Sequence, residues 1–375
     1  MGKKCGRCST RYCGPECQVQ HWKEGGHDKL CKKIKKAGGA EQFRANQKYT
    51  EAVAVAAEEC ADDTKGQTCY ICTQALHWKT KEGLVRMCAC RGTAGVAHVS
   101  CLAEQAKILV AEAEENNFDD DRFMPRWNRW HTCSLCGQHY HGVVGGALGW
   151  ACWKTYVGRP ETDWARQLAM SVLGNGLYGA KQYEDALSVQ EARLSSMTRL
   201  GALLENRLKV QSNIANTYKH LGRIDETIGL LRDVYSGYSR HLGEENGHAL
   251  KAATNYAIAL VEMQRFKEAK PLMRKTIPVV RRVLGENNEV TLRMRWTYAK
   301  ALYKDTGATL DDLREAVETL VDVEPIVRRV LGGAHPHVSI LENHLRDARA
   351  ALRARETQPS SDSRDGDLDE VEDVL

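Results

Sequence analysis

Hydrophobic and polar residues in the second half of the chain repeat with a period near 42 residues. Leu-Gly pairs stand at 200–201, 242–243, 284–285 and 331–332. Within each period, apolar residues recur three and four positions apart, which predicts two amphipathic helices joined by a short turn. Because such units cannot bury their apolar faces alone, we expect about four of them to stack into an α-solenoid over residues 165–355.

An overlay of two periods supports this register. Residues of matching character recur at an offset of 42: Asn213, Ala215, Tyr218, Arg223, Ile224, Glu226 and Leu230 correspond to Asn255, Ala257, Leu260, Arg265, Phe266, Glu268 and Leu272. The small pair Ala215 and Ala257 marks the position at which paired helices approach closely. The last unit has five extra residues around Thr306 to Leu310, which we expect in the loop between its helices.

The residues that close each unit point to a known repeat. Gly285-Glu-Asn-Asn and Gly332-Gly-Ala-His-Pro336 are similar to the closing text of tetratricopeptide repeats of the kinesin-light-chain-like kind. This resemblance implies helix pairs that bind a protein or peptide substrate. Candidate contacts on the first helices are Asn213, Asn216, Asn255 and Arg295. Residues 356–375 are rich in Ser, Pro and acidic side chains, so we expect a disordered tail.

The first half of the chain is organised by cysteines. All 14 of them precede residue 153, and seven cysteines with one histidine form four ligand pairs: Cys69/Cys72, Cys88/Cys90, His98/Cys101 and Cys133/Cys136. A structural zinc ion takes four N or S ligands, and closely spaced pairs present two ligands from one tight turn. The sequence therefore predicts two zinc sites. Paired spacing and the absence of a secretory leader favour metal-bound thiolates over disulfides.

The order of these eight ligands resembles the RING-CH (RINGv) family of ubiquitin-protein ligases over residues 68–141. Local text agrees, from Cys69-Tyr-Ile-Cys72 to Cys133-Ser-Leu-Cys136. The resemblance implies a cross-brace, in which the first pair shares one zinc ion with the third and the second shares another with the fourth. The two ligand sets would be Cys69, Cys72, His98 and Cys101, and Cys88, Cys90, Cys133 and Cys136.

The same resemblance implies a ligase that works by positioning, without a catalytic side chain or a covalent enzyme intermediate. Such a module docks a charged ubiquitin-conjugating enzyme, while the helical repeats recruit the substrate. Ile71, Trp127 and Trp130 are the expected enzyme contacts, although Ile71 could instead pack beneath the zinc ion. Holding two reactants together in this way can lower a barrier by several kcal/mol.

Three positions depart from the RING-CH pattern and keep a second interpretation open. Gln105 replaces a tryptophan, Ser134 replaces a proline, and Gly137-Gln138 stand where active RING modules often carry a cation. The alternative is a non-catalytic adaptor whose zinc fingers and repeats bind proteins. Fold alone does not separate these functions.

Residues 1–31 carry another metal pattern, which resembles a MYND zinc finger without its opening Cys-x-x-Cys pair. Carried over residue by residue, one complete zinc site comprises Cys5, Cys8, His27 and Cys31. Cys13 and Cys17 would hold half of a second site, with His21 as a conceivable third ligand. Either the chain begins after the missing pair, or this finger carries a single zinc ion. The expected total is two zinc ions in the RING-CH module and one or two in the finger.

The remaining segments are expected to connect these modules. Residues 32–67 should be a helical linker, with a helix from Gln42 to Cys60 after a break at Gly38-Gly39. Residues 142–164 should be a connector. Cys60 and Cys152 lack ligand partners and are expected to be small buried hydrophobes.

Composition excludes two classes of partner. A net charge of +4 on 375 residues is too small to indicate nucleic-acid binding. No apolar run approaches the roughly 18 residues of a transmembrane helix, so no membrane partner is expected. Together these features predict a soluble cytoplasmic or nuclear protein of multi-domain, mainly α fold, with small cross-brace α+β zinc modules followed by an α-solenoid.

Overall fold

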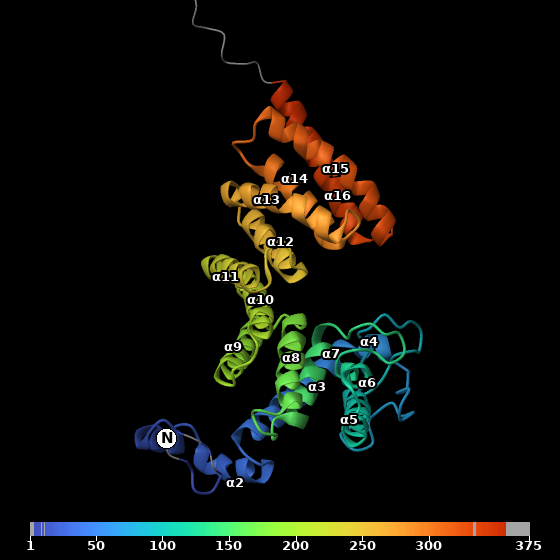
Figure 1. The fold of residues 1–375 in the computed structure, drawn as a ribbon. Coiled ribbons are helices and arrows are strands. Elements are labelled where there is room, and N and C mark those ends of the chain that lie inside the picture. The colour runs from blue at the N-terminus through green and yellow to red at the C-terminus, as the bar shows by residue number, and fades with distance from the viewer. Residues whose placement is uncertain (1–3, 9, 11, 333–334, 358–375) are drawn as a thin grey trace, which may run out of the picture. The chain divides into compact units, whose positions relative to one another are not determined.

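The structure is a computed structural model that describes residues 4–8, 10, 12–332 and 335–357. The chain divides into two compact units, Met1–Gly222 and Arg223–Leu375 (Figure 1). The described residues form helices, turns and two isolated β-bridges. This agrees with the expected mainly helical fold, in which clusters of Cys and His precede helical repeats.

The described part of the first unit contains ten α-helices and one 3-10 helix. They are α1 (Pro15–Lys23), α2 (His27–Ala37), α3 (Ala40–Glu59), α4 (Ala61–Thr64), α5 (Val99–Glu115), α6 (Asp120–Trp127), η1 (Asn128–Trp130), α7 (Gly142–Tyr156), α8 (Trp164–Gly179), α9 (Tyr183–Arg199) and α10 (Leu204–His220). The break at Gly38-Gly39 separates α2 from α3, as expected, because both glycines have positive φ. Cys60 and Cys152 are buried, also as expected.

Residues 142–164 are less of a connector than the sequence suggests, because most of them form α7. This helix packs against α3 and α8 and is apolar nearly all round, so its sequence has no amphipathic pattern to reveal it. Glycines let α7 and α8 approach closely: a Cβ on Gly176 would lie 2.4 Å from the carbonyl oxygen of Gly145. The sequence predicted a connector over residues 142–164, whereas the structure places a helix there that packs closely against α8.

Between α4 and α5 the chain forms turns rather than helices. One bridge there joins Val85 to Ala97, and a second bridge joins Thr132 to His139 in the segment between η1 and α7. The apolar face of α5, including Leu102 and Val110, covers these loops and belongs to one core with Trp127 and Trp130. The loops that carry six of the 14 cysteines are thus anchored on one side by packing.

The second unit consists of six described helices: α11 (Ile224–Leu242), α12 (Gly247–Glu262), α13 (Phe266–Leu284), α14 (Glu289–Lys304), α15 (Leu310–Leu331) and α16 (Pro336–Glu356). Each Leu-Gly pair of this unit ends a helix. Gly243 and Gly285 have φ values of 87° and 86°, which glycine adopts without the strain a side chain would cause. Asn246 and Asn288 follow three residues later, and their side chains cap α12 and α14.

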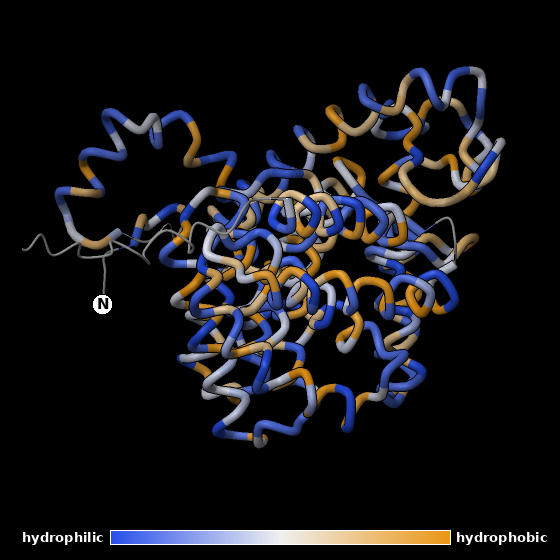
Figure 2. The backbone as a smooth tube through the Cα atoms, turned by 90° about the horizontal axis from the view of Figure 1, so that it is seen from above, coloured by the Kyte–Doolittle hydropathy of each residue, from blue (hydrophilic) through white to orange (hydrophobic). Residues whose placement is uncertain are grey.

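Hydrophobic and hydrophilic residues are interspersed along the helices (Figure 2). Ala257 and Ala299 are fully buried where helices approach closely, and Leu260, Met273 and Leu302 fill the space between neighbouring pairs. The five extra residues of the last unit form the segment between α14 and α15, as expected. The tail expected to be disordered falls outside the described residues from position 358 onward.

Candidate metal centres and partner-binding surface

Three groups of four Cys and His residues converge in the first unit. We name them by their first members: the Cys5 tetrad (Cys5, Cys8, His27, Cys31), the Cys69 tetrad (Cys69, Cys72, His98, Cys101) and the Cys88 tetrad (Cys88, Cys90, Cys133, Cys136). In each tetrad the four candidate ligand atoms lie within 4.8 Å of one another. These sets are the same as those the sequence predicted, including the cross-brace exchange of pairs.

The Cys5 tetrad is formed by an N-terminal turn and α2. The Cys5 amide donates to the Thr10 carbonyl and closes the turn, while α2 presents His27 and Cys31 one helical turn apart. The Sγ atoms of Cys5 and Cys31 are 3.8 Å apart, and Cys8 Sγ is 3.4 Å from His27 Nε2. All four side chains are buried, so the site excludes water.

The Cys69 tetrad joins a tight turn to the start of α5. The Thr73 amide donates to the Cys69 carbonyl, and Thr73 takes a positive φ of 62° to close this turn. His98 lies with Nδ1 3.4 Å from Cys72 Sγ, while its Nε2 is 3.4 Å from the Ala75 carbonyl. The contact to Ala75 orients the ring, as second-layer partners of metal-binding histidines commonly do.

The Cys88 tetrad repeats this turn with different residues. The Gly137 amide donates to the Cys133 carbonyl, and Gly137 has a φ of 70°, much like Thr73 in the first turn. Cys90 Sγ and Cys133 Sγ are 3.8 Å apart. The Tyr70 hydroxyl is 3.0 Å from Ser134 Oγ, so a direct side-chain contact ties the first turn of the Cys69 tetrad to the last turn of the Cys88 tetrad.

These separations fit zinc. A tetrahedron with Zn–S bonds of about 2.3 Å has S···S edges of roughly 3.8 Å, the value found for Cys5–Cys31 and Cys90–Cys133. All 14 cysteines are free thiols. Each tetrad supplies four N or S donors and leaves no open position, which is the arrangement of structural rather than catalytic zinc.

The thiols within a tetrad differ in acidity. Hydrogen bonds from the Cys8 amide and from His27 lower the pKa of Cys5 to about 6, and the Gln138 amide lowers that of Cys136 to about 7. Burial raises the pKa values of Cys31 and Cys90 to about 11. Metal binding at these sites would therefore release protons from the buried thiols.

Cys13 and Cys17 lie outside the three tetrads. The two thiols lie close enough to hydrogen-bond, and this hydrogen bond raises the pKa of Cys17. Their candidate third ligand, His21, is engaged instead, with Nδ1 3.1 Å from the Tyr12 hydroxyl. This pair stays a predicted half site.

The three residues predicted to contact a conjugating enzyme differ in their exposure to solvent. Ile71 is 37% exposed, whereas Trp127 and Trp130 are 2% and 0% exposed. Both tryptophan rings pack against Tyr156 in the core of the first unit, so they are not available to a partner, and this part of the prediction needs correction. Leu135, between the last two ligands, is 53% exposed and was not anticipated.

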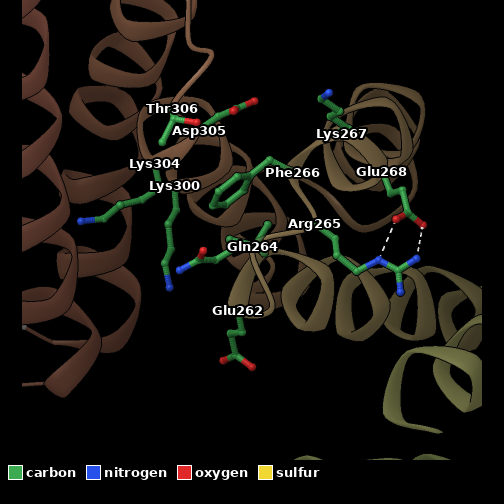
Figure 3. Close-up of a pocket in the computed structure, with 11 residues that line it drawn as sticks. Glu262, Gln264, Arg265, Phe266, Lys267, Glu268, Lys300, Lys304, Asp305 and Thr306 are labelled. Carbon is green, nitrogen blue, oxygen red and sulfur yellow. Dashed lines mark hydrogen bonds and ion pairs between the residues drawn. The ribbon is translucent and has the colours of Figure 1, made fainter. Parts of the chain in front are cut away.

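A hollow of about 790 Å³ opens in the second unit where the turn between α12 and α13 faces the end of α14. Phe266 points into it, and Lys300 and Lys304 border it (Figure 3). Arg265 turns away to make two hydrogen bonds with Glu268, of 2.6 and 2.9 Å. The sequence did not predict this hollow. The feature that could have indicated it is the pair Lys300 and Lys304, which directly precedes the five-residue insertion.

The repeat contacts proposed from sequence differ in their surroundings. Asn213, Asn216 and Asn255 are half-buried. Arg295 is 8% exposed and lies 3.3 Å from Glu286 and 3.7 Å from Asp322. Because its charge is already balanced within the unit, Arg295 is better suited to stabilise the repeats than to hold a ligand.

Two protein families match segments of this chain, one at the first zinc tetrad and one in the helical repeats. The MYND finger family matches residues 2–31, and the tetratricopeptide repeat family matches residues 207–248 and 250–289. Both resemblances expected from the sequence are therefore confirmed. Neither match reaches residues 68–141, so the RING-CH interpretation stays a prediction. No curated protein matches the sequence.

The solved structures that match this chain do so at low identity and low TM-score. A putative kinesin light chain of Podosopora anserina with nearly identical TPR-like repeats has a TM-score of 0.42 at 19% identity, covering 62% of this chain and 98% of that one. BtubC (BKLC) of P. vanneervenii has a TM-score of 0.38 at 13% identity, covering 73% and 99%. The TPR2AB domain of yeast Sti1, in complex with pHSP90, has a TM-score of 0.24 at 14% identity, covering 67% and 99%.

Among the helices that the structure describes, none combines the length and the apolar character needed to span a lipid bilayer.

Proposed function

We propose that this protein is a zinc-stabilised adaptor that binds other proteins through its helical repeats. The observation that carries the proposal is the series of stacked helix pairs, of which residues 207–248 and 250–289 match the tetratricopeptide repeat family. Stacked helix pairs form extended surfaces that accept peptides or helices. The tetrads support the same function, because four protein ligands on each ion suit a structural zinc that shapes a binding module.

The hollow beside Phe266 is the proposed partner site of the repeats. Lys267, Lys300 and Lys304 line it together with Phe266, and the acidic residues Glu268 and Asp305 in its lining are already paired with Arg265 and Lys270. This lining favours a peptide that carries acidic and apolar side chains together. Lys304 is 3.5 Å from Asp347, whereas the ammonium groups of Lys267 and Lys300 have no ion pair among the described residues. Lys300 is therefore the cation best placed to meet a ligand carboxylate.

A peptide selection tests the adaptor function. A random peptide library is selected on the full chain, and enriched peptides are measured again on Lys300→Glu. We expect acidic peptides to lose about tenfold or more in affinity, because one favourable charge contact becomes repulsive. Lys251→Glu, at an exposed position of α12 outside the hollow, is the matched control. A selection that enriches nothing, or peptides indifferent to both variants, would count against this site.

A second candidate function rests on the cross-brace exchange of ligand pairs. We propose as this alternative a RING-CH-type module that docks a ubiquitin-conjugating enzyme. Ile71 and Leu135 are exposed apolar side chains, each between two ligands, and the contact between Tyr70 and Ser134 holds their turns together. Such a surface could receive an apolar loop of the enzyme.

Self-ubiquitination with a panel of conjugating enzymes tests this alternative. Ligase activity in wild type that disappears in zinc-retaining Ile71→Ala would establish it. Val55→Ala removes a similarly exposed apolar side chain from α3 and serves as the control. If wild type is well folded but inactive, the adaptor function is favoured over the ligase function. If Ile71→Ala keeps full activity, Ile71 does not contact the enzyme.

A further inference from the structure

A groove of about 840 Å³ lies in the first unit, away from the three tetrads. One wall comes from the end of α5 and from α6, and the other from α8, α9 and the start of α10. We call it the Arg193 groove after the residue of α9 that lines it. Neither the zinc sites nor the repeat hollow uses any of its lining residues.

Arg193 carries a charge that no ion pair with a described residue balances. Its side chain is half-buried, and its Nε atom is buried without a hydrogen-bond partner. Burial alone lowers its pKa to about 10. Holding a guanidinium away from water costs free energy unless an anion or acceptor meets it.

The other cation of the groove provides an internal comparison. Arg159 makes hydrogen bonds of 2.6 and 2.9 Å to Glu114 and lies 3.6 Å from Asp163. Its pKa is raised, mainly by the hydrogen bonds to Glu114. The fold thus satisfies one arginine with a bidentate carboxylate, while Arg193 has no ion pair among the described residues.

The walls of the groove are apolar and partly open. Met124, Trp164 and Leu200 are 39%, 43% and 40% exposed, respectively. The Trp164 ring packs edge-on against Phe123 with ring centroids 4.5 Å apart, so its position is fixed. Tryptophan, methionine and arginine are the residue types enriched at protein interfaces.

We propose that the Arg193 groove binds a segment of a partner protein in which a single Asp or Glu is flanked by apolar side chains. The carboxylate would pair with the Arg193 guanidinium, and the flanking side chains would lie against Trp164, Met124 and Leu200. A doubly charged phosphate suits the groove less well, because Glu114, Asp120 and Asp163 also line it. This site is separate from the repeat hollow, so it extends the proposed adaptor function with a second binding surface.

Three peptide pools test the proposal on the full chain. Each pool has random apolar residues around a fixed centre, which is Glu, Gln or phosphoserine. We expect the Glu pool to bind wild type about tenfold more tightly than the Gln pool, the effect of one charge-assisted hydrogen bond. That preference should vanish in Arg193→Gln and persist in Arg232→Gln, a control of equal charge change on α11 whose side chain is 64% exposed.

Two further measurements separate binding from folding. Arg193→Gln should unfold at the same temperature as wild type or higher, because it removes an unbalanced half-buried charge. Met124→Ala, which alters only an exposed wall side chain, should weaken Glu-pool binding several-fold. A lower unfolding temperature in Arg193→Gln would instead assign Arg193 a structural role.

Several results would overturn the proposal. These are equal binding of the Glu and Gln pools, preference for the phosphoserine pool, or an unchanged Glu preference in Arg193→Gln. Dimerisation of wild type that Arg193→Gln abolishes would also overturn it, because a second copy would then occupy the groove. Peptides that respond to Lys300→Glu but not to Arg193→Gln report on the repeats, so the two sites can fail independently.

Discussion

Between Thr64 and Val99 the described chain has no helix, whereas within α12–α16 the longest segment between helices is residues 305–309. The first stretch supplies six of the eight ligands of the Cys69 and Cys88 tetrads together with the start of α5. The second is held by close helix packing around residues such as Leu260 and Met273. Bound metal can replace a hydrophobic core where the chain is too irregular to build one.

This contrast predicts a large difference in response to metal removal. Chelation should unfold residues 69–136, because structural zinc supplies about 10–16 kcal/mol per site in small modules. Helices α12–α16 contain none of the tetrad residues and should keep their structure. Hydrogen exchange followed by peptide would show protection lost around the tetrads and kept in α12–α16, and added zinc should restore it. Equal loss of protection around the tetrads and in α12–α16 would contradict this contrast.

The Cys88 tetrad should depend on a neighbouring glycine that is not itself a ligand, Gly95. A Cβ on Gly95 would lie 2.7 Å from Cys90 Cβ and 2.9 Å from Cys90 Sγ, at a φ of +76°. Gly95→Ala should therefore abolish zinc binding at the Cys88 tetrad and lower the zinc content by one ion. Gly92→Ala is the control, since its φ is +63° but no atom lies within 4 Å of the added Cβ. Full zinc content in Gly95→Ala, measured by native mass spectrometry, would refute this geometry.

In the repeats, a core substitution should act without affecting zinc. Leu260 of α12 is fully buried, so Leu260→Ala should lower the free energy of unfolding by about 2–5 kcal/mol. Urea denaturation measures this loss, and the zinc content should equal that of wild type. Lys251→Ala, an exposed change on the same helix, should cost little. Zinc lost along with stability would mean that the two regions depend on each other.

The smallest expected effect concerns an ion pair and depends on pH. Lys270 Nζ lies 2.7 Å from Asp305, with both side chains about 15% exposed, and this hydrogen bond, helped by the Gly307 amide, lowers the pKa of Asp305. The pair therefore stabilises the second unit above the unfolded pKa of about 3.9, and its contribution is lost as pH falls through the lower folded value.

Asp305→Asn should lower the free energy of unfolding at pH 7 by about 1 kcal/mol. The difference from wild type should begin to shrink below pH 4 and disappear as pH falls through the lowered pKa of folded Asp305. Hydrogen exchange of α13 and α15 provides the readout. Asp311→Asn, whose side chain is 94% exposed, should have no effect at either pH. A difference that does not change with pH would contradict this assignment.

The sequence predicts features that follow from local chemistry. The Leu-Gly pairs mark helix ends because only glycine takes the required φ readily, and the Cys pairs mark turns because two ligands must face one ion. Helix α7 escaped prediction because burial on all sides removes the amphipathic pattern. Trp127 and Trp130 were misassigned because nothing local to an aromatic residue tells whether the core or a partner covers it.

The surfaces could be predicted least well. Arg193 and Phe266 gain their surroundings from segments distant in the chain, such as Met124 for the first and Lys300 for the second. Sequence spacing and periodicity do not indicate that Met124 lies near Arg193 or that Lys300 lies near Phe266. Sites of this kind require the folded arrangement of helices.

The most direct test of the account is the number of zinc ions bound per chain, measured by native mass spectrometry of the purified full-length protein. Three closed tetrads predict three ions, each lost in one step when a ligand of its own tetrad is replaced, as in Cys31→Ser, Cys101→Ser and Cys136→Ser. A chain that binds no zinc, or that binds ions at fewer than three of these sites, would contradict the central claim that metal shapes the first unit.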